Sequence, residues 1–265
     1  MSLKEKKLFL LDMDGTIYLS DMLFDGTLDF LAYVRRIGGR AVFLTNNSSR
    51  GTDKYIERMK GFGIEAGPDD FVTSTDATIR YLKDKYDPAA RYYVCGTQSL
   101  KGQLAAAGLR LSESAQEGAD VVLLGYDTEL TYRKLEDCCI LLGRGADYVA
   151  THPDLVCPVW YGSAPDCGSI INMLETATGR RPFVVGKPKP AMVELAMEKT
   201  GFSPEQTVVI GDRLYTDIAC GVNAGVDTIF VLSGEGVLSD IEKYGVQPAY
   251  VFNSIRDVLD ALEKE

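Results

Sequence analysis

Histidine is nearly absent from this chain, and its cysteines are not paired in sequence. His152 is the single histidine among 265 residues, and the six cysteines include no Cys-x-x-Cys spacing. Zinc sites in proteins are built mainly from histidines and closely spaced cysteines. We therefore expect no structural zinc site. The lysine-rich start is not followed by a signal-peptide cleavage pattern, so free thiols in a reducing cytoplasm are expected.

The chain also lacks long apolar runs and an excess of positive charge. A bilayer-spanning helix needs about 20 consecutive apolar residues, and no stretch approaches that length, which argues against a membrane partner. Lys and Arg number 28 against 38 Asp and Glu, a net charge of -10. Nucleic-acid phosphates require clustered Lys and Arg, so nucleic acid is not expected as a partner either. An anionic substrate would have to be attracted locally, by a metal ion and a few cations.

What the chain does contain is a regular alternation of short apolar strands and amphipathic helices, which is typical of parallel α/β sheets. The main predicted strands are residues 8–11, 40–44, 92–95, 121–124, 148–150, 207–210, 228–232 and 249–252. A second unit begins near Pro88, and residues 151–168 are predicted to form a long loop. The expected fold class is α/β, with a doubly wound, Rossmann-like parallel-sheet core and an inserted α/β unit.

Two carboxylates follow the first apolar strand, in the run Asp12-Met13-Asp14-Gly15-Thr16. Burying a carboxylate costs several kcal/mol, roughly, unless a cation or hydrogen-bond donors meet it. Asp12 is therefore expected at the carboxyl end of the strand, where open α/β sheets bind ligands. Alternate residues of an extended chain point the same way, so Asp12 and Asp14 could serve one site. Taken alone, the run is equally well explained as an Asp-Gly turn.

Three later segments also place polar residues next to apolar strands. Small donors, Thr45-Asn46-Asn47-Ser48-Ser49, follow residues 41–44 and could hold an oxyanion. The strand 207–210 runs into Gly211-Asp212, with Asp217 five residues later, and Lys187 lies between Gly186 and Pro188. Singly, Thr45 and Asp212 could be helix caps and Lys187 a solvated charge. Their joint occurrence at strand ends, in this order, favours one shared site.

Together these segments resemble the motifs of the haloacid dehalogenase-like hydrolase superfamily. The four motifs of that pattern are matched by Asp12 to Thr16, by Thr45, by Lys187 and by Gly211-Asp212 with Asp217. The details Thr45-Asn46-Asn47, Gly186-Lys187-Pro188 and Thr216-Asp217 are similar to the NagD-like, para-nitrophenylphosphatase-type branch. The resemblance covers nearly the whole chain.

The resemblance implies a domain organisation. Residues 1–78 and 182–265 would form the catalytic core, and residues 79–181 a cap domain that closes over the active site. The short segment between the first motif and the first helix leaves no room for a cap there. A homodimer formed through the cap is a further expectation.

The resemblance also implies a chemistry, the magnesium-dependent hydrolysis of small phosphate monoesters such as sugar phosphates or nucleotides. Asp12 would attack phosphorus and form an aspartyl-phosphate, and Asp14 would act as general acid and base. Asp12, the backbone carbonyl of Asp14, and Asp212 would hold Mg²⁺, which prefers oxygen ligands.

Further residues would support this chemistry. Thr45 and Lys187, with the N–H groups of Asn46 and Asn47, would hold the phosphate oxygens. Asp217 would orient Lys187 or a metal-bound water. Dehalogenating members lack a carboxylate at the position of Asp14, so this residue favours phosphate chemistry.

Substrate specificity is assigned to the loop 151–168, and within it to Cys157, Trp160 and Tyr161. Two positions of the loop depart from the branch's pattern. His152 replaces Asn in an Asn-x-Asp pattern that ends at Asp154, and Asp166 replaces the first Gly of Pro-Gly-x-Gly-Ser. We predict a structural role for His152, because Asp14 already supplies acid-base chemistry.

Three other functions remain open at this point. A phosphomutase would transfer the phosphoryl group to a second sugar hydroxyl. A phosphate-receiving signalling domain also combines a metal, an Asp, a Thr and a Lys, but usually accepts phosphate on a later strand and has no cap. A non-catalytic sugar-phosphate-binding protein would not need both Asp12 and Asp14.

Overall fold

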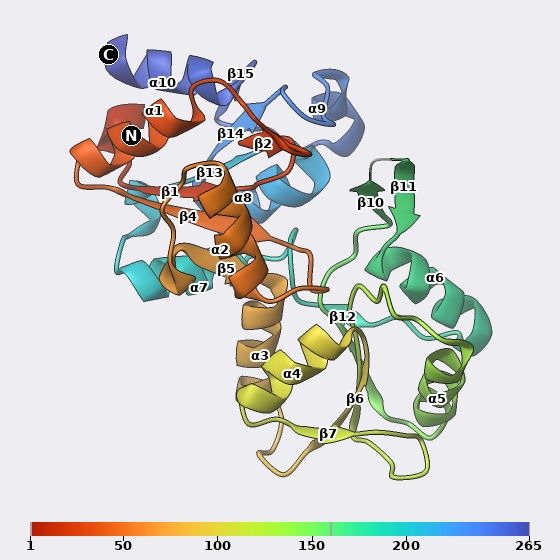
Figure 1. Cartoon of the computed structure of the whole chain (residues 1–265). Helices are drawn as coiled ribbons and strands as arrows, with labels where there is room; N and C mark the ends of the chain where they lie inside the picture. Colours follow the sequence, from red (N-terminus) through yellow and green to blue (C-terminus); the bar gives the residue numbers. More distant parts are fainter. Residues whose placement is uncertain (1, 160, 265) are drawn as a thin grey trace. The chain divides into compact units, whose positions relative to one another are not determined.

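The computed structural model describes residues 2–159 and 161–264, and it divides into two compact units (Figure 1). The first unit contains the chain up to Thr45, then Tyr55–Val72, and the chain from Lys187 on. The second contains Asn46–Lys54 and Thr73–Gly186. The chain therefore leaves the first unit directly after Thr45, returns to it, and leaves it again for the long insertion.

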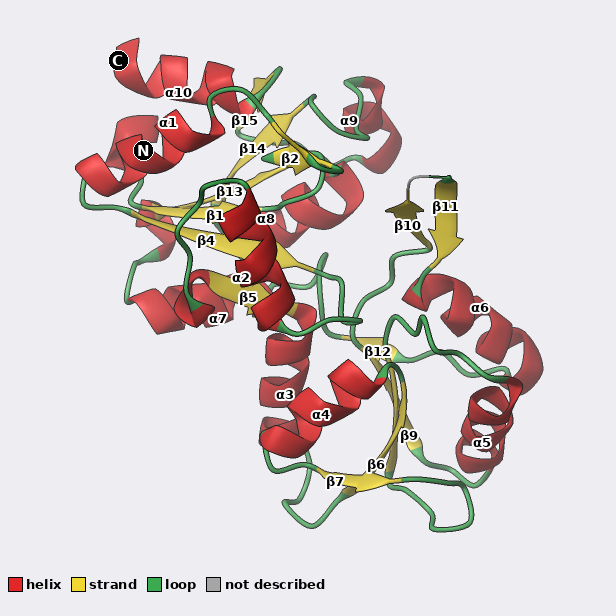
Figure 2. Cartoon of the chain, viewed as in Figure 1, coloured by secondary structure: helices red, strands yellow, loops and turns green. Residues whose placement is uncertain are grey.

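The first unit is built on a six-stranded sheet with the strand order β15-β14-β13-β1-β4-β5 (Figure 2). Its strands are β1 Leu8–Leu11, β4 Arg40–Thr45, β5 Phe71–Thr73, β13 Thr207–Gly211, β14 Asp227–Val231 and β15 Tyr250–Phe252, with the hairpin β2 Tyr18–Leu19 and β3 Met22–Leu23 after β1. Its helices are α1 Thr27–Arg36, α2 Thr52–Gly61, which begins in the second unit, α7 Ala191–Thr200, α8 Ala219–Asn223, α9 Ser239–Tyr244 and α10 Ile255–Lys264.

Helices on both faces of this sheet explain its apolar strands. β1 pairs in parallel with β13 on one side and with β4 on the other, and all four of its side chains are buried. Helices α1 and α10 lie on one face and α7 on the other (Figure 1). Helix α10 buries one stripe, Ile255, Val258, Leu259 and Leu262, at helical spacing. The core is thus a doubly wound parallel sheet, as predicted.

The second unit has its own sheet of five strands, in the order β12-β9-β8-β6-β7, and every neighbouring pair is parallel. Its strands are β6 Arg91–Cys95, β7 Arg110–Ser112, β8 Val121–Leu124, β9 Asp147–Ala150 and β12 Phe183–Val184, with a separate hairpin of β10 Val156–Val159 and β11 Gly162–Pro165. Its helices are α3 Ser74–Lys85, α4 Gln98–Ala106, α5 Tyr132–Gly143 and α6 Cys167–Thr178.

The predicted fold class is confirmed, but residues 151–168 are not one long loop. They contain the antiparallel hairpin β10–β11 and the beginning of α6, which Asp166 caps by accepting a hydrogen bond from the Cys167 N–H. Pro158 and Pro165 lie within the two strands, and proline usually argues against a strand. The hairpin is also largely exposed, so the apolar alternation by which strands are recognised is weak.

The predicted domain boundaries at 78 and 182 stay a prediction; the compact units divide the chain before Thr73 and before Lys187, and residues 46–54 lie in the second unit. Thr73 caps α3, accepting from the Asp76 N–H, and the helix continues without a break to Lys85. A boundary at residue 78 would therefore cut this helix. In the part of the chain that the structure describes, no helix is long and apolar enough to cross a membrane.

Candidate active site

The candidate site lies at the carboxyl ends of the neighbouring strands β4, β1 and β13. Thr45 is the last residue of β4, Asp12 follows β1, and Asp212 follows β13. The Asp12 N–H donates to the Ile210 carbonyl at 2.9 Å, which extends the pairing of β1 with β13 by one residue. Parallel strands therefore bring these side chains to one edge of the sheet.

Lys187 lies between two carboxylates of this edge. Its Nζ is 2.6 Å from Asp12 Oδ1 and 2.5 Å from Asp217 Oδ1, and its side chain is 3% exposed. The turn that carries Lys187 is held by the chain around α8, since Asn223 Nδ2 donates to the Pro188 carbonyl at 2.8 Å. A buried lysine with two such partners is held in one position.

Asp217 lies on a π-helical turn, Leu214–Ile218, which precedes α8. Its two oxygens have separate partners: Oδ1 binds Lys187, and Oδ2 accepts the Arg213 N–H at 3.1 Å. Helical backbone therefore begins at Leu214, before α8 itself. The π turn begins two residues after Asp212 in sequence, and its wider spacing lets the Asp217 carboxylate lie close to Asp212.

Asp212 is enclosed by backbone. Its Oδ2 accepts the Glu235 N–H at 2.7 Å, and a Cβ on Gly234 or Gly15 would lie only 2.0 or 2.5 Å from Oδ2. The two glycines are joined through Ser233, whose hydroxyl donates to the Gly15 carbonyl at 2.7 Å. Oδ1 of Asp212 is buried and has no hydrogen-bond partner among the described residues. A buried carboxylate oxygen without a partner is costly, so a ligand at this position would stabilise it.

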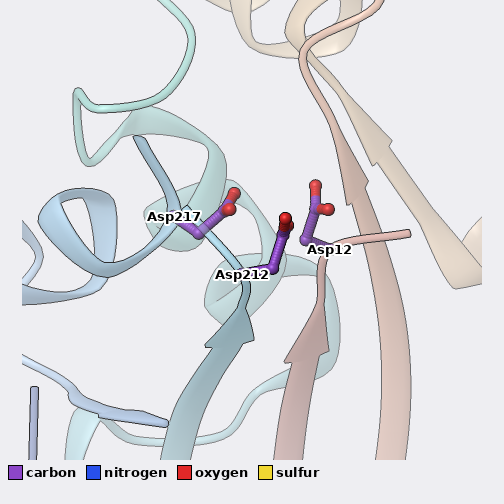
Figure 3. Close-up of side chains that lie close together, drawn as sticks. All are labelled: Asp12, Asp212 and Asp217. Carbon is purple, nitrogen blue, oxygen red and sulfur yellow. The ribbon is translucent and has the colours of Figure 1, made fainter. Parts of the chain in front are cut away.

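Asp12, Asp212 and Asp217 form a compact acidic group (Figure 3). One oxygen of each lies within 4.8 Å of the others. Across residues 2–159 and 161–264, no other set of His, Cys, Asp or Glu side chains is arranged to hold a metal ion in this way. An oxygen-only ligand set with an unsatisfied oxygen at Asp212 is suited to a hard divalent cation.

The electrostatics of the group show an excess of negative charge. Burial, and then the neighbouring Asp217 carboxylate, raise the pKa of Asp12, although Lys187 opposes the shift. Burial and Asp217 also raise the pKa of Asp212 to about 7. Burial works against the charge of Lys187, but Asp12 and Asp217 raise its pKa above the usual value. Lys187 alone does not neutralise three carboxylates, and the nearby Arg213 is already paired with Glu235 at 2.9 Å. A divalent cation would supply the missing positive charge.

Other predicted residues lie outside this group. Asp14 is exposed, and the Gly15 N–H next to it donates to the Tyr18 carbonyl at 2.8 Å, which anchors its turn to the hairpin β2–β3. Asn46 and Asn47 follow Thr45 in the chain but belong to the second unit. The roles of these residues stay predictions.

Two of the predicted specificity residues lie in or beside the hairpin β10–β11, and the third is not described. Cys157 is a partly buried residue of β10, Tyr161 is 63% exposed in the turn that follows, and Trp160 lies outside the described residues. Sequence reasoning missed the segment 233–236, which encloses Asp212. Its Gly-Glu-Gly follows the apolar strand β14, so the strand-end rule that singled out Asp212 could have found it.

Family models match both parts of the chain that carry these residues. A model described as haloacid dehalogenase-like hydrolase matches residues 9–110, and one described as HAD-hydrolase-like matches residues 184–258. The chain belongs to the haloacid dehalogenase-like hydrolases.

Relatives of this hydrolase cover almost its whole length. An acid sugar phosphatase of Staphylococcus aureus is 33% identical over 262 residues, which are 99% of this chain and 100% of the relative. The crystal structure of a 4-nitrophenylphosphatase from Thermotoga maritima is 40% identical, with a TM-score of 0.92 and 98% of each chain covered.

A third relative was solved with a metal ion. The glycerol phosphate phosphatase of Mycobacterium tuberculosis, in complex with magnesium, is 31% identical with a TM-score of 0.91, over 99% of this chain and 78% of that one. All three relatives are named phosphatases. The predicted superfamily and its nitrophenylphosphatase-type branch are confirmed, and so is the enzyme class, a phosphoric monoester hydrolase.

Proposed function

We propose that this enzyme is a magnesium-dependent phosphatase that hydrolyses small phosphate monoesters through an aspartyl-phosphate on Asp12. The proposal rests mainly on the side chains that surround Asp12. Its carboxylate is held by Lys187 at 2.6 Å, beside an Asp212 oxygen that has no partner among the described residues. Asp12, Asp212 and the backbone carbonyl of Asp14 would hold Mg²⁺, which when bound would offset the repulsion between the ester and the carboxylates.

In the first half-reaction, an Asp12 oxygen forms a bond to phosphorus while the bond from phosphorus to the leaving oxygen breaks. Asp14 gives its proton to the leaving oxygen, which departs as an alcohol. In the second, Asp14 takes a proton from a water that attacks the phosphorus, and inorganic phosphate leaves Asp12. Asp14 is exposed, which suits a group that must exchange protons with alcohol and water.

Binding of the transferring phosphoryl group is assigned to Thr45, Lys187 and the N–H groups of Asn46 and Asn47. Lys187 keeps Asp12 in one position while it contributes positive charge. Thr45 ends β4 next to β1, and Asn46 and Asn47 continue the chain directly from it. Fixed donors at the reacting group stabilise developing charge without reorganising during the reaction.

The second unit is proposed to act as the cap that selects the substrate. The hairpin β10–β11 and its turn expose apolar side chains that an ester could contact, including Val156 at 42% and Tyr161 at 63%. The names of the relatives favour sugar and glycerol phosphates as the substrate class. We propose that Cys157, Trp160 and Tyr161 help to choose among such esters.

The experiment that tests the function is a phosphate-release screen with magnesium over sugar phosphates, glycerol phosphates, nucleotides and pyridoxal phosphate. Many turnovers per enzyme, with inorganic phosphate as product, are expected for one class. Single-turnover labelling without release would favour a phosphate-receiving domain, and transfer to a second sugar hydroxyl would favour a phosphomutase. Asp12→Asn is the control for contaminating activity.

A further inference from the structure

The two positions that depart from the branch's pattern contact each other. His152 Nε2 lies 2.9 Å from Asp166 Oδ1, and the relative exposures of the two residues are 0% and 4%. Asp166 Oδ1 also accepts the Cys167 N–H at 2.5 Å. The histidine and the aspartate, which replace an asparagine and a glycine of the pattern, thus form one buried pair within the second unit.

A line of hydrogen bonds leads from this pair to Ser48. His152 Nδ1 lies 2.9 Å from the Thr151 hydroxyl, which lies 3.0 Å from the Ser48 hydroxyl. Ser48 Oγ in turn accepts the Tyr126 N–H at 3.0 Å. One assignment of protons that satisfies the line has Ser48 donate to Thr151, Thr151 donate to Nδ1, and Nε2–H donate to the Asp166 carboxylate.

A second line runs in parallel through Asp154. Asn46 Nδ2 lies 3.1 and 3.2 Å from the two Asp154 carboxylate oxygens. The Asp154 backbone carbonyl accepts the Gly168 N–H at 2.8 Å, and a Cβ on Gly168 would lie 2.2 Å from the Pro153 carbonyl oxygen. The segment 151–154 is therefore packed closely on the start of α6. Through Asp154 and Thr151 it contacts Asn46 and Ser48.

These contacts do not form a nucleophilic site. A hydroxyl, a histidine and an aspartate in a row also occur in covalent hydrolases, where the hydroxyl must be reached by substrate. Thr151, His152 and Ser48 are all 0% exposed. The line is suited to fixing backbone, because buried polar groups that are all satisfied specify one arrangement.

We propose that His152 and Asp166 are positioning residues for the phosphate-binding segment 46–49, an inference that rests on the proposed function. By fixing residues 151–154 on α6, the pair sets the positions of Ser48 and Asn46. It therefore acts on phosphate binding through other residues and touches no substrate. Loss of the pair should weaken the binding of ester and of free phosphate alike, and leave the chemical step on Asp12 largely unchanged.

The test uses His152→Asn, Asp166→Gly and the double variant, assayed with magnesium and para-nitrophenyl phosphate. Asn reaches the Thr151 contact but not Asp166, so the first variant leaves a buried carboxylate without its partner. KM and the inhibition constant of inorganic phosphate should both rise by about fivefold, the effect of one good hydrogen bond, with kcat within about twofold. The double variant removes the stranded carboxylate too, and should recover much of the loss.

Two variants serve as controls. Asp166→Asn keeps an oxygen that accepts from His152 and Cys167, so its constants should stay within about twofold of the wild type. Tyr93→Phe removes a different buried contact of the second unit, with Asp137 at 3.2 Å, and should lower Tm without changing either constant. His152 is the only histidine, so its ring nitrogens give one assignable set of NMR signals, and Nε2 is expected to carry a proton.

The outcomes separate this inference from the proposed function. If the wild type neither hydrolyses esters nor binds phosphate by calorimetry, the proposed function fails. If the wild type is active and His152→Asn lowers Tm but leaves KM and phosphate inhibition unchanged, the pair is only structural and the inference is overturned. Simple addition of the two single effects in the double variant, or a ring protonated at Nδ1 alone, would also overturn it.

Discussion

Asp12 and Asp217 are joined by one amino group, that of Lys187, at 2.6 and 2.5 Å. The Asp217 side chain is 2% exposed and that of Lys187 3%, so solvent screens their charges little. Asp212 belongs to the same acidic group and adds a third carboxylate. The arrangement is short of positive charge, and the consequences of that deficit can be measured.

Lys187→Gln should destabilise the enzyme in a metal-dependent way. Breaking a buried ion pair costs about 3–5 kcal/mol, because the remaining charge is left uncompensated. Magnesium should restore part of the lost stability, since it would supply the missing positive charge. Denaturant unfolding with excess magnesium and with EDTA measures both effects.

Lys6→Gln is the matched control for this experiment. Lys6 is also buried, and its Nζ lies 2.6 Å from Asp227, outside the acidic group. Its substitution should destabilise the enzyme equally in magnesium and in EDTA. If both variants responded to magnesium alike, the assignment of the metal to the group around Lys187 would be wrong.

Asp212→Ala should weaken magnesium binding more than Asp217→Ala. Asp212 has a free oxygen within the described structure, whereas both Asp217 oxygens already accept hydrogen bonds from Lys187 and the Arg213 N–H. Titration of magnesium against activity gives the half-saturating concentration for each variant. The reverse ranking would show that Asp217, and not Asp212, is the direct ligand.

Magnesium binding should also depend on the segment 233–236, which encloses Asp212. In Gly234→Ala the new Cβ would lie 2.0 Å from Asp212 Oδ2, so the carboxylate or the loop must move. We expect magnesium half-saturation to rise at least about tenfold, as when an outer partner of a metal ligand is lost. Gly102→Ala, in α4 with nothing within 4 Å of the new Cβ, should leave it unchanged. If the two variants had the same magnesium half-saturation, the segment 233–236 would have no role in the metal site.

Local pattern was enough to predict the sheet edge. Four consecutive apolar residues before Asp12 indicate a strand covered on both faces, and all four are buried. The same reasoning placed Asp212 directly after β13, whereas Lys187 lies in a turn after β12, which belongs to the other sheet. These elements could be predicted because burial and strand direction depend on a few neighbouring residues.

Interactions across long separations could not be predicted in this way. The Glu235 N–H donates a hydrogen bond to Asp212, 23 residues away in sequence. Asn46 donates one to Asp154, 108 residues away in sequence. In neither pair does the local sequence around one residue identify the other residue as its partner. The hairpin β10–β11 was missed for a different reason, because it is short, exposed and contains two prolines.

Substrate preference should change with the hairpin. Cys157→Ala and Tyr161→Ala should each shift the ratio of kcat/KM between a sugar phosphate and glycerol phosphate by about tenfold, if the truncated side chain packs against one of the two esters. Para-nitrophenyl phosphate provides a small, activated reference ester. If each variant scaled all esters equally, specificity would have to be assigned elsewhere.

Covalent catalysis by Asp12 is the central claim, and the most direct measurement is intact-protein mass spectrometry of acid-quenched turnover mixtures. In Asp14→Asn the second half-reaction loses its base, so a fraction carrying one added phosphoryl group should accumulate. Peptide mapping should place that group on Asp12, and Asp12→Asn should show neither the adduct nor turnover above background. Full turnover by pure Asp12→Asn, or a phosphoryl group mapped to another residue, would contradict the account.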